Sequence, residues 1–304
     1  MVSGGNLTDT YQSPGTLAMT PECIWPLAAK LGEGALWFEN AFWFTDIKLK
    51  KIHRLDPATG AKRSWDAPGQ IGFIAPIAGG GFIAGLQGSL QRFDPESGAF
   101  TLIVRVEDDK PGNRLNDGAV DAKGRLWFGS MEDAEENATG ALYCFEKGAL
   151  RVADRGYLVT NGPTFSPDGR TLYHTDTLRK EIYAFDCAED GSLSNKRLFV
   201  RIEDGAGYPD GPVMDAKGYL WTGLFGGWEV RRYSPAAKLV QTVRFPVSCI
   251  TKIAFGGPHL TDVYATTAWK ALDEAGRAKE PLAGGVFHFR SDVPGLAANT
   301  VLLA

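Results

Sequence analysis

The sequence predicts an all-β fold, a six-bladed β-propeller whose blades are four-stranded antiparallel sheets. Each of six similar units supplies three or four short apolar segments, and no segment has a helical period with caps at both ends. A two-sheet sandwich, the competing fold, would not explain the sixfold recurrence. An aromatic residue recurs at one place in the units, at spacings of roughly 40–48 residues that suit propeller blades: Trp43, Phe82, Trp127, Tyr173, Trp221 and Tyr264.

The six units can be traced in order along the chain. Several share a hairpin pattern in which a polar turn such as Asp121-Ala122-Lys123-Gly124 separates two apolar segments. The strands expected in successive units lie at 35–37, 42–46 and 51–56; at 80–84 and 90–94; at 126–128 and 141–145; at 172–176 and 182–185; around 221 and at 230–233; and at 263–266 and 285–289.

The two ends of the chain carry separate predictions. The segment 23–28 belongs to no unit, and a closed ring needs its ends joined, so we expect it to form the outer strand of the last blade. Residues 1–18 are rich in Gly, Ser and Thr and contain no Lys or Arg, so we interpret them as a flexible N-terminal extension and not as a secretory signal. No linker interrupts the remainder, and residues 19–304 are expected to form one propeller domain.

Composition narrows the class of protein. With 44% apolar and 22% charged residues the chain can bury a full core. A net charge of −4 and the absence of a Lys/Arg run argue against nucleic acid or an anionic membrane as partner. The four cysteines are far apart and form no Cys-x-x-Cys pair, which favours reduced thiols in a cytoplasmic protein. We expect a monomer.

Candidate functional residues are expected in the loops that lead to the inner strands, because propellers bind ligands at one mouth of the central channel. Glu33, Asn161 and Asp210 supply two carboxylates and one amide oxygen. These donors suit a hard divalent cation such as calcium, magnesium or manganese, and suit iron(II) or zinc less specifically. A dense polar cluster that includes Arg114, Asn116 and Asp117 abuts the third unit.

Other interpretations stay open for several of these positions. Taken alone, Asn161-Gly162 and Asp210-Gly211 are ordinary turn signals. Glu33 between two glycines is harder to explain as a turn. The acidic residues of 132–136 are interpreted as a solvated lid. The four histidines show no metal-ligand spacing, and no Gly-x-Ser-x-Gly elbow supports a Ser-His-Asp triad.

Several motifs together resemble one known family. They are Leu-Gly-Glu-Gly around Glu33, the run 113–118 followed by 126–131, Asn161-Gly162-Pro163, Pro209-Asp210-Gly211, and the later 254–257. Their order is that of the SMP-30/gluconolactonase/LRE family, which also includes regucalcin. The resemblance runs from about Cys23 to the C-terminus. Within the family it is greatest to bacterial sugar-acid lactonases, xylonolactonase above all.

The resemblance implies roles for individual residues. Glu33, Asn161 and Asp210 match the family's ligands for one divalent metal ion, which could be iron(II), zinc, manganese, calcium or magnesium. Asp210 also matches the proposed catalytic base. Arg114 and Asn116 match residues that hold the substrate's oxygens, and Asp117 lies in the same pocket. The family's later acidic residue has no clean counterpart here, since the loop reads Glu-Asp-Ala-Glu-Glu.

The resemblance therefore implies a hydrolase of carboxylic ester bonds. We expect a metal-dependent lactonase that opens small sugar lactones, such as xylonolactone, arabinonolactone or gluconolactone, to aldonic acids in sugar oxidation. Two alternatives remain. One is a calcium-binding, regucalcin-like protein without catalysis. The other is a lactonase or phosphotriesterase for larger substrates, which a wide apolar mouth would favour over a narrow polar one.

Overall fold

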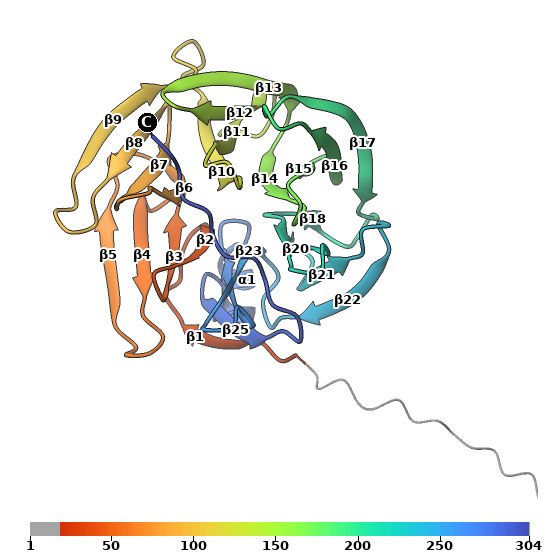
Figure 1. The fold of residues 1–304 in the computed structure, drawn as a ribbon. Helices are drawn as coiled ribbons and strands as arrows, with labels where there is room; N and C mark the ends of the chain where they lie inside the picture. Colours follow the sequence, from red (N-terminus) through yellow and green to blue (C-terminus); the bar gives the residue numbers. More distant parts are fainter. Residues whose placement is uncertain (1–18, 304) are drawn as a thin grey trace, which may run out of the picture.

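The structure, a computed structural model, describes residues 19–303. Its strands form six antiparallel sheets set as blades around a central axis (Figure 1). The first three blades, each given from the inner to the outer strand, are β2 (Gly32–Phe38), β3 (Ala41–Asp46), β4 (Lys51–Leu55) and β5 (Lys62–Asp66); β6 (Ile71–Pro76), β7 (Phe82–Leu86), β8 (Ser89–Phe93) and β9 (Phe100–Arg105); and β10 (Asn113–Val120), β11 (Leu126–Glu132), β12 (Gly140–Glu146) and β13 (Ala149–Tyr157).

Blades four to six follow the same plan with two variations. In blade five the inner strand is split into two short segments, and in blade six the outer strand comes from the start of the chain. These blades are β14 (Thr160–Phe165), β15 (Thr171–Asp176), β16 (Glu181–Cys187) and β17 (Leu193–Arg201); β18 (Tyr208–Pro209) with β19 (Val213–Met214), then β20 (Leu220–Phe225), β21 (Glu229–Tyr233) and β22 (Leu239–Arg244); and β23 (Ile250–Gly256), β24 (Asp262–Thr267), β25 (Val286–Arg290) and β1 (Glu22–Trp25).

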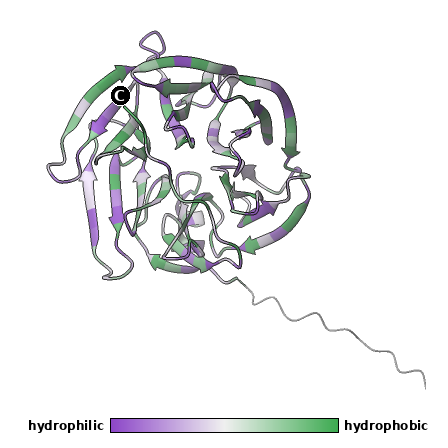
Figure 2. Ribbon diagram, in the orientation of Figure 1, coloured by the Kyte–Doolittle hydropathy of each residue, from purple (hydrophilic) through white to green (hydrophobic). Residues whose placement is uncertain are grey.

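The recurring aromatic residues lie where the sequence predicted a common position. Each of the six falls in the second strand of its blade, β3, β7, β11, β15, β20 or β24, and all six are buried. The core is divided into clusters that join neighbouring blades. One cluster, for example, packs Phe73 and Ile83 of blade two against Leu115 and Phe128 of blade three. Hydrophobic residues accordingly appear in the strands of every blade (Figure 2).

Ring closure also follows the prediction. Strand β1 pairs antiparallel with β25, with Cys23 opposite Phe287. The indole of Trp25 then meets the rings of Phe44 and His53 in blade one edge-on, at centroid distances of 5.6 and 5.7 Å. The outer strand of blade six therefore fastens the last blade to the first. Residues 1–18, expected to be an extension, lie outside the described residues.

One element differs from the all-strand expectation. Between β24 and β25 a short helix, α1 (Glu274–Lys279), begins at Asp273, whose carboxylate accepts a hydrogen bond of 2.7 Å from the Gly276 backbone N–H. Because the helix buries none of its residues, it leaves no hydrophobic period that sequence reasoning could detect. Within residues 19–303 no helix has the length and hydrophobicity to cross a membrane. All four cysteines are free, and three of them are buried.

Candidate active site

The inner strands share an irregularity at one level of the propeller. Pairing with the second strand shifts register between Glu33 and Leu36 in β2, between Leu115 and Gly118 in β10, and between Asn161 and Thr164 in β14. Strands β6 and β23 shift in the same way, and blade five is interrupted there between β18 and β19. Bulges redirect side chains and are frequent beside active sites.

This irregularity corrects one prediction. We expected Glu33, Arg114, Asn116 and Asn161 in loops before the inner strands, and they lie within strands β2, β10 and β14. Only Asp210 lies between strands. The strands begin before the hydrophobic pattern does, because backbone pairing continues through polar residues near the bulges. The Asn-Gly and Asp-Gly pairs, which alone signal turns, and the Glu33-Gly34 pair mark these bulges and the break in blade five.

Two of the three predicted metal ligands, Glu33 and Asp210, come together although they belong to blades one and five. Asn161 of blade four is linked to them indirectly, because the N–H of the next residue, Gly162, donates to Asp117, whose charge acts on both carboxyl groups. Glu33 and Asn161 are each 2% exposed, and Asp210 is 6% exposed. The Glu33 and Asp210 carboxyl groups are within hydrogen-bonding reach of each other. Burial, followed by the negative charge of Asp117, raises the pKa of Glu33 to about 7. Burial and the charge of Glu33 raise the pKa of Asp210 well above its usual range.

Backbone groups orient the carboxylates of this cluster. The Glu33 carboxylate accepts a hydrogen bond of 2.8 Å from the N–H of Gly34. Asp210 accepts the corresponding bond of 3.0 Å from Gly211. In each case the donor is the glycine that follows the acid, so the same short motif fixes a carboxylate in two different blades.

The amide of Asn161 is oriented from both sides. Its nitrogen donates to the Thr177 hydroxyl at 2.8 Å, and its oxygen accepts a hydrogen bond of 3.2 Å from the Asn116 amide. The amide oxygen therefore faces Asn116 and the nitrogen faces away. Thr177 was not anticipated, and a threonine after a strand gives no sequence signal for such a role.

The donor set suits a divalent cation. Two buried carboxylates in contact repel each other when both are ionised, and a cation between them removes that penalty. Within residues 19–303 no group of three or more His, Cys, Asp or Glu side chains is arranged to hold a metal. The candidate set of Glu33, Asn161 and Asp210 therefore depends on the amide oxygen as its third donor. It leaves coordination positions open, as a catalytic site requires.

Two hydrogen-bond donors are fixed beside the ligand set. Arg114, 2% exposed, donates from Nε to Asp133 at 2.7 Å and from Nη1 to the Asn116 amide oxygen at 2.5 Å. Asn116 in turn donates to the Thr160 carbonyl at 2.5 Å. Sequence reasoning paired Arg114 with Asn116, and the structure places them in direct contact.

The acidic loop of blade three lies at the rim of this site and is only partly solvated. Glu136 is exposed as expected, but Asp133 accepts hydrogen bonds from Lys48 at 2.5 Å and Gln70 at 3.0 Å. Burial raises the pKa of Asp133, but these two hydrogen bonds and the charge of Arg114 outweigh it and hold that pKa well below its usual range.

A second ion pair extends this rim. Glu135 of the same loop pairs with Lys270, which follows β24 in blade six. Lys48 lies in blade one, so the loop of blade three bonds to side chains from two other blades. The rim of the candidate site is therefore polar, and hydrogen bonds and ion pairs join the blades that form it.

The sixth blade contributes a residue that sequence reasoning missed. Lys252 in β23 places its Nζ 2.5 Å from the Asp117 carboxylate. The signal was a lone lysine within the otherwise apolar or threonine-containing stretch 250–256. Asp117, predicted to lie in the substrate pocket, is 0% exposed and also accepts bonds from the N–H groups of Gly118 and Gly162, each at 2.8 Å. Its oxygens are thus occupied by protein partners.

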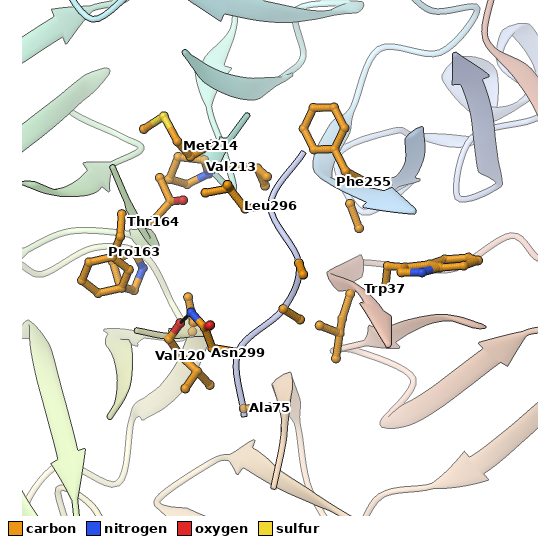
Figure 3. Close-up of a pocket in the computed structure, with 18 of the residues that line it drawn as sticks. Trp37, Ala75, Val120, Pro163, Thr164, Val213, Met214, Phe255, Leu296 and Asn299 are labelled. Carbon is orange, nitrogen blue, oxygen red and sulfur yellow. Dashed lines mark hydrogen bonds between the residues drawn. The ribbon is translucent and has the colours of Figure 1, made fainter. Parts of the chain in front are cut away.

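A cavity of about 330 Å³ lies further along the axis (Figure 3). It is lined by the later halves of the inner strands, including Trp37, Met214 and Phe255, and is mostly apolar. The C-terminal segment crosses it with Leu296 and Asn299 (Figure 3). Glu33, Asn161 and Asp210, from the earlier halves, do not line it. The polar rim around Asp133 is therefore the side from which a small polar ligand could approach the candidate ligands.

Comparisons with known proteins identify the family of the chain. Residues 31–269 match the model of the SMP-30/Gluconolactonase/LRE-like region. Regucalcin from Xenopus laevis is 32% identical over 88% of this chain and 92% of its own length. A 6-deoxy-6-sulfogluconolactonase from Pseudomonas putida is 30% identical over 91% of this chain and 97% of its own.

A solved structure of a relative has the same fold. Regucalcin from Agrobacterium tumefaciens, described as a calcium-binding protein, superposes with a TM-score of 0.91 at 27% identity, covering 94% of this chain and 98% of that one. The family model covers most of the propeller, and the relatives named include a lactonase. The chain therefore belongs to the SMP-30/gluconolactonase/LRE-like family.

Proposed function

We propose that this protein is a metal-dependent lactonase that hydrolyses aldonolactones to aldonic acids. The observation that carries the proposal is the placement of Arg114 and Asn116, two rigid donors, directly beside the ligand set of Glu33, Asn161 and Asp210. A protein that only bound a cation would have no need for such donors. The lactonase among the relatives supports the same reaction class.

The residues divide the chemistry between them. A divalent cation held by Glu33, Asn161 and Asp210 would supply Lewis-acid stabilisation of the negative charge that develops on the lactone carbonyl oxygen. Arg114 would donate to that oxygen or to a neighbouring hydroxyl. Asn116, whose amide hydrogens are taken by Thr160 and Asn161, would hold Arg114 and Asn161 in place and offer its amide oxygen to the sugar. Asp210 would accept a proton from the attacking water as the general base. The proton then passes to the ring oxygen as the ester C–O bond breaks.

The polar rim supports a small substrate. Asp133, Lys48 and Gln70 border the site, whereas the apolar cavity lies on the other side of the ligand set. A sugar lactone presents hydroxyl groups that suit such a rim. A large apolar ester or phosphotriester would find few hydrophobic contacts there. A sugar lactone is therefore the substrate class that we propose.

The test is metal-dependent acid release from D-xylonolactone, L-arabinonolactone and D-gluconolactone. Chelated protein is compared with protein reloaded with iron(II), zinc, manganese, calcium or magnesium, and each lactone has its own buffer blank because these rings open unaided. Glu33→Gln and Asp210→Asn should abolish most of the metal-dependent rate, whereas Glu136→Gln, at an exposed position of the rim loop, should not. Metal binding without turnover of any lactone would overturn the proposal in favour of a calcium-binding role.

A further inference from the structure

Lys252 occupies a position that ordinarily excludes charge. Every residue of β23 is buried, and Lys252 itself is 6% exposed. An ammonium group in such surroundings is costly unless a charged partner compensates for the loss of water. Here the partner is Asp117, which is 0% exposed and lies 2.5 Å away. The pair is therefore buried and not a surface ion pair, with the lysine side chain also lining the axial cavity.

The Lys252–Asp117 pair is built into the segments that carry the predicted ligands. The second Asp117 oxygen accepts the backbone N–H of Gly162, the residue after Asn161, at 2.8 Å. The aliphatic stem of Lys252 lies against Gly211, the residue after Asp210. A Cβ atom at position 211 would come within 2.7 Å of the lysine Cγ, so glycine is needed there.

The third ligand segment is reached through the neighbour of Lys252 in the same bulge. The hydroxyl of Thr251 donates a hydrogen bond of 2.5 Å to the carbonyl of Gly32, the residue before Glu33. The bulge of β23 thus contacts the chain next to Asp210 and Glu33 directly, and the chain next to Asn161 through Asp117. A residue placed in this way can set both their spacing and the charge that they experience.

The charges of this buried cluster can be counted. Glu33, Asp117 and Asp210 contribute three carboxylates and Lys252 contributes one ammonium, which leaves a net charge of −2 when all are ionised. Arg114, the other buried cation near the ligands, is paired with Asp133 at the rim. A single divalent cation would neutralise the remaining charge.

We propose that Lys252 is the internal counter-charge of the metal centre: by neutralising Asp117 it matches the buried cluster to one divalent cation. This inference rests on the proposed metal centre but not on lactone hydrolysis. It makes Lys252 a positioning and charge-setting residue and not a catalytic one. In this proposal Asp117 does not bind the metal or the substrate, because its carboxylate is bonded to Lys252 and to the backbone of blade four.

Charge rescue tests the assignment. Asp117→Asn leaves the Lys252 ammonium uncompensated beside the ligands, and divalent affinity should fall on the order of 10- to 100-fold through repulsion in a site of low dielectric. Adding Lys252→Met restores the original net charge with a side chain of similar length. The double variant should therefore recover most of the lost affinity. Affinity is measured for manganese and calcium by calorimetry or chelator competition, without any substrate.

An ion pair of the same composition provides the matched control. Lys180 and Asp204 lie 2.8 Å apart at the surface, with the Asp204 side chain fully exposed. Lys180→Met changes the protein's net charge by the same amount as Lys252→Met but should leave divalent affinity unchanged. Circular dichroism and the thermal midpoint establish that each variant is folded. If Asp117→Asn alone does not fold, the divalent affinities of Lys252→Met and of the double variant are compared at lower temperature.

The outcomes separate this inference from the proposed function. Recovery of affinity in the Asp117→Asn, Lys252→Met double variant supports the counter-charge role. Equal loss in the single and double variants overturns it, because Asp117 would then act as a ligand in its own right. A wild-type protein that binds no divalent cation overturns the metal centre itself, whereas one that binds but turns over no lactone leaves the counter-charge role intact.

Discussion

The carboxyl groups of Glu33 and Asp210 lie within hydrogen-bonding reach of each other, although they belong to blades one and five. Both are buried, and the structure raises the pKa of each. Such a pair holds a proton when no cation is present, because two adjacent negative charges cannot be stabilised without water. Proton and metal should therefore compete for the same oxygens.

This competition predicts a pH-dependent metal affinity. The pKa of Glu33 is raised to about 7, and a carboxylate must lose its proton to become a ligand. Apparent affinity should therefore fall roughly tenfold per pH unit below about pH 7, and the raised pKa of Asp210 should add to this dependence. Chelator competition across this range measures the effect after correction for the chelator's own titration. Glu33→Gln should bind more weakly and with a flatter pH dependence. A wild-type affinity independent of pH would contradict the prediction.

Arg114 should matter for turnover and not for metal binding. Its guanidinium bridges Asp133 and Asn116 and does not contact the carboxylates of the ligand set. Arg114→Gln should lower kcat on the order of 10²–10³-fold, as loss of an oxyanion donor does, with divalent affinity close to wild type. Steady-state kinetics on a lactone and calorimetry on the metal separate the two effects. Arg92→Gln, at an exposed position, is the control, and equal losses of affinity and rate in Arg114→Gln would refute the assignment.

The sequence predicted the blade repeat and the closing strand well, and the membership of the candidate site stays a prediction. The repeated aromatic residues are a local pattern, and residues such as Trp43 and Trp127 each mark the second strand of a blade. The bulges could not be predicted, because they depend on the pairing of each inner strand with its neighbour. Lys252 was missed for a related reason. A lone lysine in a strand is interpreted as solvent-facing unless its partner, Asp117 in a different blade, is already known.

Gly72, in the bulge of β6, should be essential to the neighbouring site. A Cβ atom there would lie 2.2 Å from the Asn116 carbonyl oxygen and 2.6 Å from that of Leu115. These are backbone atoms that cannot rotate away, so Gly72→Ala must displace β10 and with it the Arg114–Asn116 pair. We expect overpacking to lower the free energy of unfolding by about 1–3 kcal/mol. The lactonase rate should also fall, because the Arg114–Asn116 pair is displaced.

The neighbouring Gly69 supplies the control for this substitution. A Cβ atom at position 69 would meet only Leu86, at an ordinary contact distance of 3.8 Å. Gly69→Ala should therefore retain both stability and rate. Urea unfolding and lactone kinetics on the two variants decide the matter, and a Gly72→Ala protein with wild-type kinetics would show that β10 tolerates the displacement.

Two buried histidines predict acid sensitivity of the fold. Burial lowers the pKa of His53 to about 4, with a further contribution from the charge of Lys51, and lowers the pKa of His174 to about 3. His174 is 0% exposed, and neither ring nitrogen has a hydrogen-bond partner among the described residues. Its ring packs edge-on against Tyr157 at 4.7 Å. Both imidazoles are therefore neutral in the folded protein at neutral pH.

The sign of the effect follows from proton binding. In the unfolded chain each histidine takes up a proton near pH 6.5, so below that pH the unfolded state binds more protons and stability falls until the folded pKa is reached. Each residue should remove about 2 kcal/mol of unfolding free energy between about pH 7 and pH 5. In urea titrations at the two pH values, His174→Phe, which preserves a ring against Tyr157, should lose less stability on acidification by about that amount. His259→Gln, at an exposed position, should behave as wild type, and an unchanged acid loss in His174→Phe would show that His174 accepts a proton without unfolding.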